Sequence, residues 1–361
     1  MTMTGSPTPR MVAVLPDIEA NIAAMAAYAQ ARGKRLRPHA KTHKSPDIAR
    51  LQIAAGAIGI SCATVSEVEA MAAAGIGGLL LTSPIASAKC ARVAALHRAD
   101  KDVMAVVDSI AAVEAYAAAN AGASTPLRLL VDIDIGHKRT GTQTPAVTVA
   151  VARRIGEEKG LVYAGVQAYA GHAQHVDKAA ERRKLAETCA ANLKAHLDAL
   201  TAAGLAPAIV TGSGTGCFAD DMEIGLYTEF QVGSYVVMDT EYAVIERGAG
   251  PLFVPALFVE ATVICTQFED FVLVDAGHKA LFRAGPTPVV AGDRGKSLRY
   301  EFMGDEHGRL RGAAADLPKM GEKIRLVLPH CDPNVVLYDH IDVEKSGATI
   351  AQWPVTARGV W

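Results

Sequence analysis

Residues 36–44 contain an amine that could bind an aldehyde covalently. They read Leu-Arg-Pro-His-Ala-Lys-Thr-His-Lys, which places Lys41 between two histidines at the end of a strand-like run. A lysine at the carboxyl end of a first barrel strand points into the mouth where βα-barrel chemistry takes place. We expect neighbouring cations and partial desolvation to lower the pKa of Lys41, so that its neutral amine can form a Schiff base. The alternative is a solvated basic turn, because such clusters are usually exposed; Lys44 is the nearest rival.

Residues 132–141 offer a donor for an anionic oxygen. They read Asp-Ile-Asp-Ile-Gly-His-Lys-Arg-Thr-Gly and follow a predicted strand. The guanidinium of Arg139 presents a fixed fork of donors that suits a ring oxygen or a carboxylate. The alternative is a turn in which Arg139 pairs with Asp132 or Asp134.

Residues 211–216 read Thr-Gly-Ser-Gly-Thr-Gly and follow a later strand. Alternating glycines leave backbone N–H groups free to converge on a phosphate, which loops after the seventh and eighth strands of such barrels often bind. A flexible glycine loop is the alternative. The pattern lacks the G-x-x-x-x-G-K-[ST] spacing, so binding of a nucleoside triphosphate is not supported.

Two segments carry histidines with neighbouring polar groups. Residues 169–175 read Tyr-Ala-Gly-His-Ala-Gln-His, and a histidine there could act as a general base. Residues 329–334 read Pro-His-Cys-Asp-Pro-Asn after a predicted strand. In an extended segment His330 and Asp332 would project to one side, where they could share Mn²⁺ or Mg²⁺, and Cys331 to the other. The alternatives are ordinary loop histidines and a surface turn.

The composition excludes several classes of protein. The 361 residues are 50% hydrophobic and 20% charged, enough for a large core and more than one domain. A net charge of −2 with dispersed charges predicts no nucleic-acid or membrane-surface partner. The N-terminus lacks a secretory pattern and no apolar run reaches the roughly 18–20 residues that span a bilayer, so we expect a cytoplasmic protein. The six cysteines form no C-x-x-C pair, and we expect them to be reduced and mostly buried.

The order of elements predicts an α/β fold with a (β/α)₈ TIM-type barrel. Apolar runs rich in Val, Ile and Leu alternate with Ala-rich helical segments such as 17–32. The predicted strands are 36–41, 57–62, 78–83, 103–108, 127–133, 162–169, 208–212 and 229–237. Beyond residue 245 the sequence is rich in strand-like segments joined by turns. This pattern predicts a mostly antiparallel β domain with a loop-like stretch at 283–320. We expect domains at 20–245 and 246–361, the second joined by an N-terminal strand at 10–16.

In combination and in this order, these motifs resemble those of one enzyme family. They are Arg37-Pro38-His39-x-Lys41-Thr42-His43-Lys44, Asp134-x-Gly136-x-x-Arg139-x-Gly141, Gly212-Ser213-Gly214-Thr215 and His330-x-Asp332. The chain resembles the fold-type III pyridoxal phosphate enzymes of the D-threonine aldolase and D-serine dehydratase group, which are distantly similar to alanine racemase. The resemblance runs from about residue 10 to the C-terminus.

The resemblance implies a role for each motif. Lys41 would be the Schiff-base lysine, Arg139 would contact the phenolate side of the cofactor, and Tyr169 would lie near its ring. The residues implied in phosphate binding are Ser213, Gly214, Thr215, Gly216 and Tyr235. His330 and Asp332 would bind a metal beside the substrate. Dehydratases of the group carry His-x-Cys and use zinc, whereas the aldolases carry His-x-Asp and use Mn²⁺ or similar ions, so Asp332 favours an aldolase.

The sequence therefore predicts a carbon–carbon lyase that depends on pyridoxal 5'-phosphate and a divalent metal, Mn²⁺ or Mg²⁺. It would cleave D-3-hydroxy-α-amino acids of the D-threonine type to glycine and an aldehyde. His175 is the expected base for the β-hydroxyl proton, and His172 is its alternative. The expected partners are the amino-acid substrate and a second copy in a homodimer. A D-serine or 3-hydroxy-D-aspartate dehydratase and a non-catalytic pyridoxal phosphate-binding protein stay open as alternatives.

Overall fold

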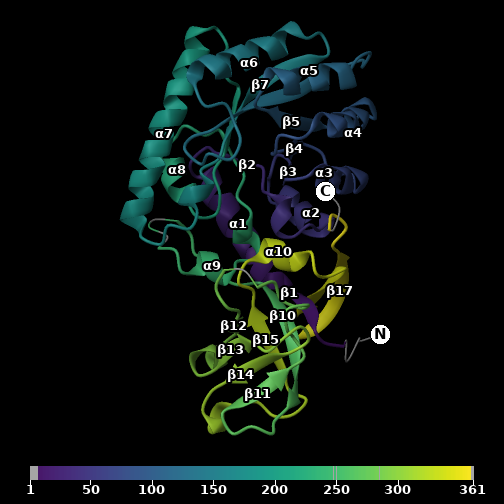
Figure 1. The fold of residues 1–361 in the computed structure, drawn as a ribbon, viewed down its shortest axis with the longest axis vertical. Helices are drawn as coiled ribbons and strands as arrows, with labels where there is room; N and C mark the ends of the chain where they lie inside the picture. The colour runs from purple at the N-terminus through teal and green to yellow at the C-terminus, as the bar shows by residue number, and fades with distance from the viewer. Residues whose placement is uncertain (1–6, 247, 249, 284, 359–361) are drawn as a thin grey trace.

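The computed structural model describes residues 7–246, 248, 250–283 and 285–358. The chain forms two parts, an α/β barrel and a smaller β domain, with β1 and the helices α1, α9 and α10 where they meet (Figure 1). The barrel holds an eight-stranded parallel sheet, and the β domain is built on a nine-stranded, mostly antiparallel sheet.

The eight strands of the barrel run in the order β2-β9-β8-β7-β6-β5-β4-β3 and are all parallel. A parallel bridge between His39 and Ser61 joins the two outer strands and closes the sheet. The predicted (β/α)₈ barrel is confirmed. The strands are β2 Arg35–Leu36, β3 Ser61–Cys62, β4 Leu79–Leu81, β5 Val103–Val107, β6 Leu127–Ile133, β7 Leu161–Ala168, β8 Ile209–Gly212 and β9 Glu229–Phe230.

Helices follow the strands and cover the outside of the barrel. Several begin at residues whose side chains cap the first turn: Thr64, Ser109 and Thr144 each accept a hydrogen bond from a backbone N–H three residues on. The helices are α1 Leu15–Gln30, α2 Pro46–Ala54, α3 Val65–Ala73, α4 Ser87–Arg98, α5 Ile110–Ala119, α6 Pro145–Glu157, α7 Ala179–Ala202, α8 Phe218–Ile224, α9 Thr240–Ala243 and α10 Cys331–Val335. The helix predicted at 17–32 is α1, shifted by two residues.

Barrel strands are apolar on both faces because helices cover one face and the barrel interior the other. All five residues of β5 are buried. Within the barrel, a buried arginine, Arg37, bonds both carboxylate oxygens of Glu229 on β9, at 2.9 and 3.1 Å, and also the carbonyl of Gly78. A Cβ at Gly59 would collide with that guanidinium and one at Gly78 would crowd it, so these glycines make room for the ion pair.

The second sheet contains the first strand of the chain. β1 Arg10–Val14 pairs antiparallel with β10 Leu257–Cys265 and parallel with β16 His340–Lys345. The other strands are β11 Phe271–Val274, β12 Val289–Val290, β13 Arg299–Phe302, β14 Gly308–Arg311, β15 Lys323–Val327 and β17 Ala348–Pro354. We propose residues 20–245 and 246–361 as the two domains, with β1 belonging to the second.

Three local predictions were wrong. The stretch 283–320 is not a loop: it contains β12 and the hairpin of β13 and β14, whose turn residues concealed short strands. The strand predicted at 36–41 ends at Leu36, because Pro38 lacks an N–H and residues Ala40–Thr42 form a 3₁₀ turn. The strand predicted at 229–237 likewise ends at Phe230, and Ser234–Val236 form a second 3₁₀ turn.

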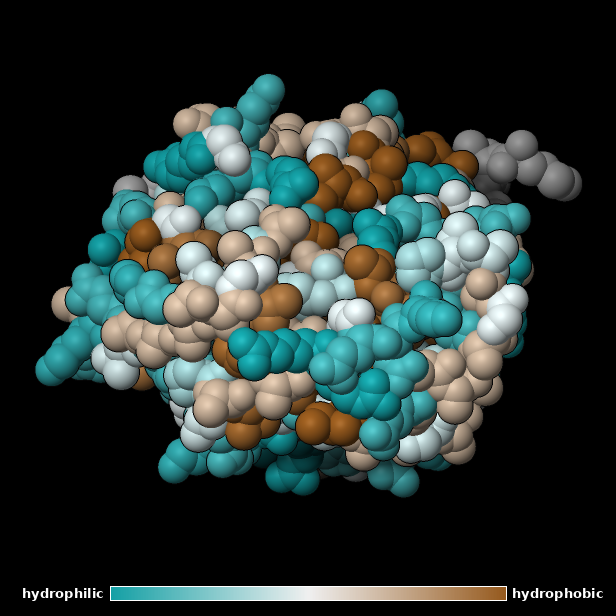
Figure 2. Space-filling model, turned by 90° about the horizontal axis from the view of Figure 1, so that it is seen from above, coloured by the Kyte–Doolittle hydropathy of each residue, from teal (hydrophilic) through white to brown (hydrophobic). Residues whose placement is uncertain are grey.

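The surface carries few large apolar groups on the face seen from above the barrel. Figure 2 shows hydrophilic residues over most of this face, with hydrophobic residues in small groups between them. In the described part of the chain, no helix combines the length and apolar character needed to cross a bilayer. All six cysteines are unpaired, and five of them are buried, as predicted.

Substitution of Arg10 tests whether its ion pairs hold β1 in the sheet. The Arg10 side chain lies 2.8 Å from Glu260, 2.8 Å from Asp342 and 2.9 Å from Glu344, whose side chains are at most 7% exposed. Arg10→Met should lower the free energy of unfolding by about 3 kcal/mol, because carboxylates inside the sheet lose their shared cation. Urea unfolding measures this change. Arg50→Met, at an exposed ion pair, should cost under about 0.5 kcal/mol; equal losses would contradict the assignment.

Candidate active site

A cavity opens at the carboxyl ends of the barrel strands, where active sites of this fold lie. It brings together six of the residues singled out in the sequence. They are Lys41, Arg139, Tyr169, Ser213, Gly214 and Thr215. The other described lining residues are His39, Thr42, Ala63, Thr82, Ser83, Gln167, Gln231, Gly233, Ser234 and Tyr242.

Lys41 projects into this cavity from the 3₁₀ turn that follows β2. The side chain of His39 accepts a hydrogen bond from the Lys41 backbone N–H at 3.2 Å, which holds the turn. Lys41 Nζ lies 3.1 Å from Asp332 Oδ2. The charge of Asp332 raises the pKa of Lys41 and outweighs the lowering by burial. The expected lowering of this pKa by neighbouring cations was therefore wrong, because the nearest charge is an anion from the other domain.

Lys44, the rival amine, occupies a structural position. It is buried, has a positive φ of 50°, and forms an ion pair with the buried Glu67 at the start of α3. Glu67 also accepts the N–H of Ala63 at 2.6 Å, so this pair ties the turn after β2 to the loop after β3. Of the two lysines, Lys41 lines the cavity.

Arg139 lines the cavity because its acidic neighbours are bonded elsewhere. Asp134 accepts the backbone N–H groups of Gly136 and Lys138, at 3.0 and 2.9 Å. Asp132 accepts hydrogen bonds from Thr140 and Gln167, both at 2.8 Å. Neither carboxylate forms an ion pair with Arg139, so the alternative turn pairing is not formed. The guanidinium carbon lies 5.4 Å from the centre of the Tyr169 ring, near enough for both side chains to face one ligand.

The glycine loop after β8 packs tightly against the turn that contains Gln174. A Cβ at Gly214 would touch the Gln174 side chain, and a Cβ at Gly216 would collide with its backbone. Ser213 has a φ of 65°, a left-handed conformation that is uncommon for residues other than glycine. The loop is therefore fixed in place, which argues against the flexible alternative.

Two residues predicted in phosphate binding lie beneath this loop rather than on the cavity wall. Gly216 N–H donates to Gln174 Oε1 at 3.0 Å. The Tyr235 side chain is buried, and its hydroxyl accepts a hydrogen bond from Gln52 at 3.0 Å. The backbone N–H of Tyr235 donates to Thr215 Oγ1 at 3.1 Å, so Tyr235 supports the loop from below. We therefore propose that Tyr235 contributes to phosphate binding only by supporting the loop.

His330 and Asp332 belong to the β domain and are not among the residues that line the cavity, but Asp332 contacts Lys41, which is. His330 Nε2 lies 3.8 Å from Asp332 Oδ2, and their side chains are only 24% and 16% exposed, so the segment is not a surface turn. The expected extended segment is wrong, because α10 begins at Cys331 and His330 precedes its first turn. Cys331 nevertheless points away, as expected: it is buried, and its thiol donates to the carbonyl of Met238.

The pair fits part of a metal centre. Asp332 Oδ1 is buried and has no hydrogen-bond partner among the described residues. Its lone pairs are therefore available to bind a cation. His330 Nδ1 lies 3.0 Å from Asp239 Oδ2, an arrangement typical of metal-binding histidines that use Nε2. Burial alone would lower the pKa of His330, but Asp239 and Asp332 outweigh it and raise the pKa. No group of three or more His, Cys, Asp or Glu side chains able to hold a metal occurs in the described ranges.

The two candidate bases lie in different surroundings. The ring of His175 is 6.4 Å from that of His330 and 4.9 Å from that of Tyr242, between their centres. His172 instead stacks on His137 at 5.6 Å, and its Nε2 lies 3.6 Å from the thiol of Cys189. His175 is therefore the histidine beside the proposed metal ligands.

Sequence reasoning missed several polar residues around the cavity. A chain of hydrogen bonds crosses the barrel: Gln231 donates to Gln167 and Thr211. Gln167 in turn donates to Asp132. Burial raises the pKa of Asp132 to about 6, although Gln167 and Thr140 stabilise its charge. Asp239 and Glu241, which contact His330, come after the last barrel strand in a segment without any recognisable motif. An Asp-x-Glu pattern alone is too common to have singled them out.

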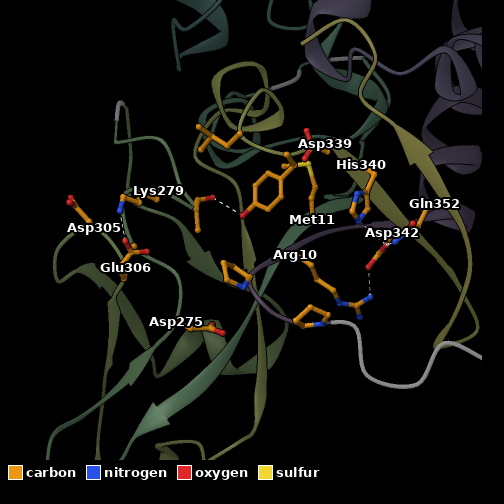
Figure 3. Close-up of a pocket in the computed structure, with 16 residues that line it drawn as sticks. Arg10, Met11, Asp275, Lys279, Asp305, Glu306, Asp339, His340, Asp342 and Gln352 are labelled. Carbon is orange, nitrogen blue, oxygen red and sulfur yellow. Dashed lines mark hydrogen bonds and ion pairs between the residues drawn. The ribbon is translucent and has the colours of Figure 1, made fainter. Parts of the chain in front are cut away.

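A larger cavity, of about 790 Å³, lies in the β domain (Figure 3). Much of its charge is paired within the wall: Arg10 bonds Asp342, and Lys279 bonds Glu306. Residues of β1, β16 and β17 contribute to its lining, and none of the residues that surround Lys41 does. The barrel cavity is therefore the candidate active site.

Comparisons with known proteins identify the family of the chain. The family model of the alanine racemase N-terminal domain matches residues 14–241, which is more than half of the chain. The chain belongs to this family. A second family model, the putative serine dehydratase domain, matches residues 256–343, which include His330 and Asp332.

Individual relatives share nearly the whole length. A D-threonine aldolase of Arthrobacter sp. is 36% identical over 98% of this chain and 93% of its own. A 3-hydroxy-D-aspartate aldolase of Paracoccus denitrificans (strain Pd 1222) is 36% identical over 98% and 92%. The crystal structure of a D-threonine aldolase from Filomicrobium marinum superposes with a TM-score of 0.93 at 36% identity, covering 98% of this chain and 95% of the other. The resemblance to the D-threonine aldolase and D-serine dehydratase group is confirmed.

The position of Lys41 predicts the site of covalent cofactor attachment. Lys41→Ala should lose the absorbance of covalently bound pyridoxal phosphate, because alanine has no amine to condense with the aldehyde. Spectra of the purified, cofactor-saturated proteins measure this. Lys44→Ala is the control and should keep the absorbance while unfolding at a lower temperature, since Glu67 loses its buried partner. Retention of the covalent cofactor in Lys41→Ala would move the attachment to another lysine.

Proposed function

We propose that the protein is a pyridoxal phosphate- and divalent-metal-dependent aldolase. It cleaves D-3-hydroxy-α-amino acids of the D-threonine type to glycine and an aldehyde, and is thus a carbon–carbon lyase. The observation that carries this proposal is the 3.1 Å approach of Asp332 to Lys41, with His330 beside it. An amine suited to the cofactor and two ligands suited to a metal thus lie side by side, although they come from opposite parts of the chain.

The barrel residues hold the cofactor. Lys41 supplies the amine for attachment, Arg139 and Tyr169 face the ring, and Ser213, Gly214 and Thr215 receive the phosphate, with Gly216 and Tyr235 as their support. When bound, pyridoxal phosphate supplies an electron sink for the pair released from the substrate Cα. The fixed glycine loop and the buried support from Tyr235 orient the ring, so the protein's part here is positioning.

His330 and Asp332 hold the divalent ion. When bound, the ion lowers the pKa of the substrate β-hydroxyl. An imidazole and a carboxylate favour a hard or borderline ion, so we propose Mn²⁺ or Mg²⁺. A thiolate at the position of Asp332 would favour zinc instead, and the thiol of Cys331 is turned away into the core.

His175 removes the proton of the β-hydroxyl oxygen. As the Cα–Cβ bond breaks, that oxygen becomes the carbonyl of the aldehyde, and the electron pair of the bond stays with Cα. A proton then replaces the lost carbon on Cα and gives glycine. His175 lies beside His330 and is half-exposed, so its proton can return to solvent. His172 is stacked on His137 away from the ligands and keeps a supporting role in the loop.

Two alternatives differ in product or in metal use. A D-serine or 3-hydroxy-D-aspartate dehydratase would release a keto acid rather than an aldehyde, and the oxygen ligand Asp332 disfavours it. A non-catalytic pyridoxal phosphate-binding protein has no use for His330 and Asp332 at the cofactor lysine. A homodimer and a cytoplasmic location stay predictions of the family resemblance and of the sequence, respectively.

Product analysis with and without chelator tests the function. With D-threonine and Mn²⁺, the enzyme should form glycine and acetaldehyde in equal amounts. Excess EDTA should abolish turnover and leave the absorbance of the bound cofactor in place, because Lys41 and the metal ligands serve different steps. Chromatography of both products and the visible spectrum are the measurements. A keto acid product would establish the dehydratase, and undiminished cleavage in EDTA would remove His330 and Asp332 from the reaction.

Substitution of each histidine tests the proton acceptor. His175→Ala should lower kcat by roughly 10²–10⁴, the usual effect of losing a general base, and should keep the cofactor. His172→Ala is the matched control from the same loop and should retain most activity. Steady-state kinetics with D-threonine measure both. A severe His172→Ala and a mild His175→Ala would reverse the assignment.

A further inference from the structure

One carboxylate lies between the proposed base and the proposed metal ligand. Glu241 Oε1 is 3.5 Å from His175 Nδ1, and Glu241 Oε2 is 3.2 Å from His330 Nδ1. Its side chain is 29% exposed, so the carboxylate is largely sheltered from solvent. The Nδ1 atoms of both imidazoles therefore face the same carboxylate, that of Glu241.

The backbone fixes Glu241 in this place. It belongs to α9, whose first turn is capped by Asp239: the Asp239 side chain accepts the Tyr242 N–H at 2.9 Å. The N–H of Glu241 donates to the carbonyl of Pro329 at 3.2 Å, which attaches α9 directly to the segment that carries His330. Figure 1 shows α9 and α10 at the junction between the barrel and the β domain.

The geometry matters because a neutral imidazole carries one proton. If that proton is on Nδ1, Nε2 has the free lone pair that binds a metal or accepts a proton. A carboxylate beside Nδ1 favours this tautomer and fixes the ring orientation. For His330, Asp239 Oδ2 at 3.0 Å also performs this task. For His175, no other carboxylate among the described residues lies within 4.0 Å of a ring nitrogen.

We propose that Glu241 is a positioning residue that sets the Nδ1–H tautomer of His175 and His330 together, leaving both Nε2 atoms free for the reaction. The proposal rests on the proposed function and deepens it. Since His330 has a second partner in Asp239 and His175 does not, loss of Glu241 acts mainly through His175. The effect on proton transfer therefore exceeds the effect on metal binding.

Glu241→Gln tests the proposal. Its amide has nearly the same size, but only one of the two positions now held by carboxylate oxygens remains an acceptor, and the NH₂ group at the other faces an imidazole as a donor. We expect kcat with D-threonine to fall by about 10- to 100-fold, the usual range for loss of such an outer partner, with KM changed by less than about threefold. Mn²⁺ affinity, measured by calorimetric titration, should weaken by less than about tenfold. Glu241→Asp should recover part of kcat.

A double substitution separates positioning from general structural damage. If Glu241 acts through His175, Glu241→Gln should change kcat by less than about threefold in a His175→Ala background, because the group it orients is gone. Equal effects of Glu241→Gln in both backgrounds would overturn the proposal. Glu246→Gln, an exposed glutamate a few residues on, is the matched control and should leave kcat within about threefold.

The tautomer of His175 can be measured without turnover, so the result does not depend on the proposed function. In protein labelled with ¹⁵N-histidine, the ring nitrogens of His175, assigned by comparison with His175→Ala, should show Nδ1 protonated in the wild type. They should show a mixture of tautomers in Glu241→Gln. An Nε2-protonated His175 in the wild type would overturn the positioning role even if the aldolase activity is present. Absence of aldolase activity with the predicted tautomer intact would instead overturn the proposed function.

Discussion

The contact between Asp332 and Lys41 is the constraint on which the site depends. It joins a carboxylate from the β domain to an amine at the mouth of the barrel, at 3.1 Å. Burial alone would raise the pKa of Asp332, but the charges of Lys41 and His330 outweigh it and keep the pKa low. A buried ionised pair costs desolvation energy and persists only where both partners are held in place. The packing of α9 and α10 at the domain junction provides this restraint.

The architecture could be predicted from the sequence because its signals are local. Eight apolar runs, which alternate with helical segments, indicated the number of barrel strands. Strand ends were less predictable. The turn at Ala40–Thr42 depends on a hydrogen bond from a backbone N–H to the ring of His39, and no periodicity of side chains reveals such a bond.

The site was predictable in its motifs and not in its electrostatics. Lys41, Arg139 and the glycine loop follow strands that end at one rim, so their convergence follows from the fold. The raised pKa of Lys41 and the ion pairs of Asp239 and Glu241 with His330 depend on contacts between residues at least 89 positions apart. Tyr235 shows the same limit, since its backbone and hydroxyl are bonded beneath the loop, whereas the family resemblance implied that it binds the phosphate.

The place of β1 in the second sheet has a consequence for the order in which the chain can fold. Arg10 on this strand bonds Glu260 and Asp342, which are 250 and 332 positions away. β1 is therefore made long before β10 and β16, the strands with which it pairs. Most barrel strands pair with the next strand in sequence, β2 with β9 being the exception, so the barrel can form in the meantime. The segment with His330 and Asp332 lies between β15 and β16, so the active site becomes complete only after all the barrel strands and β15 have been made.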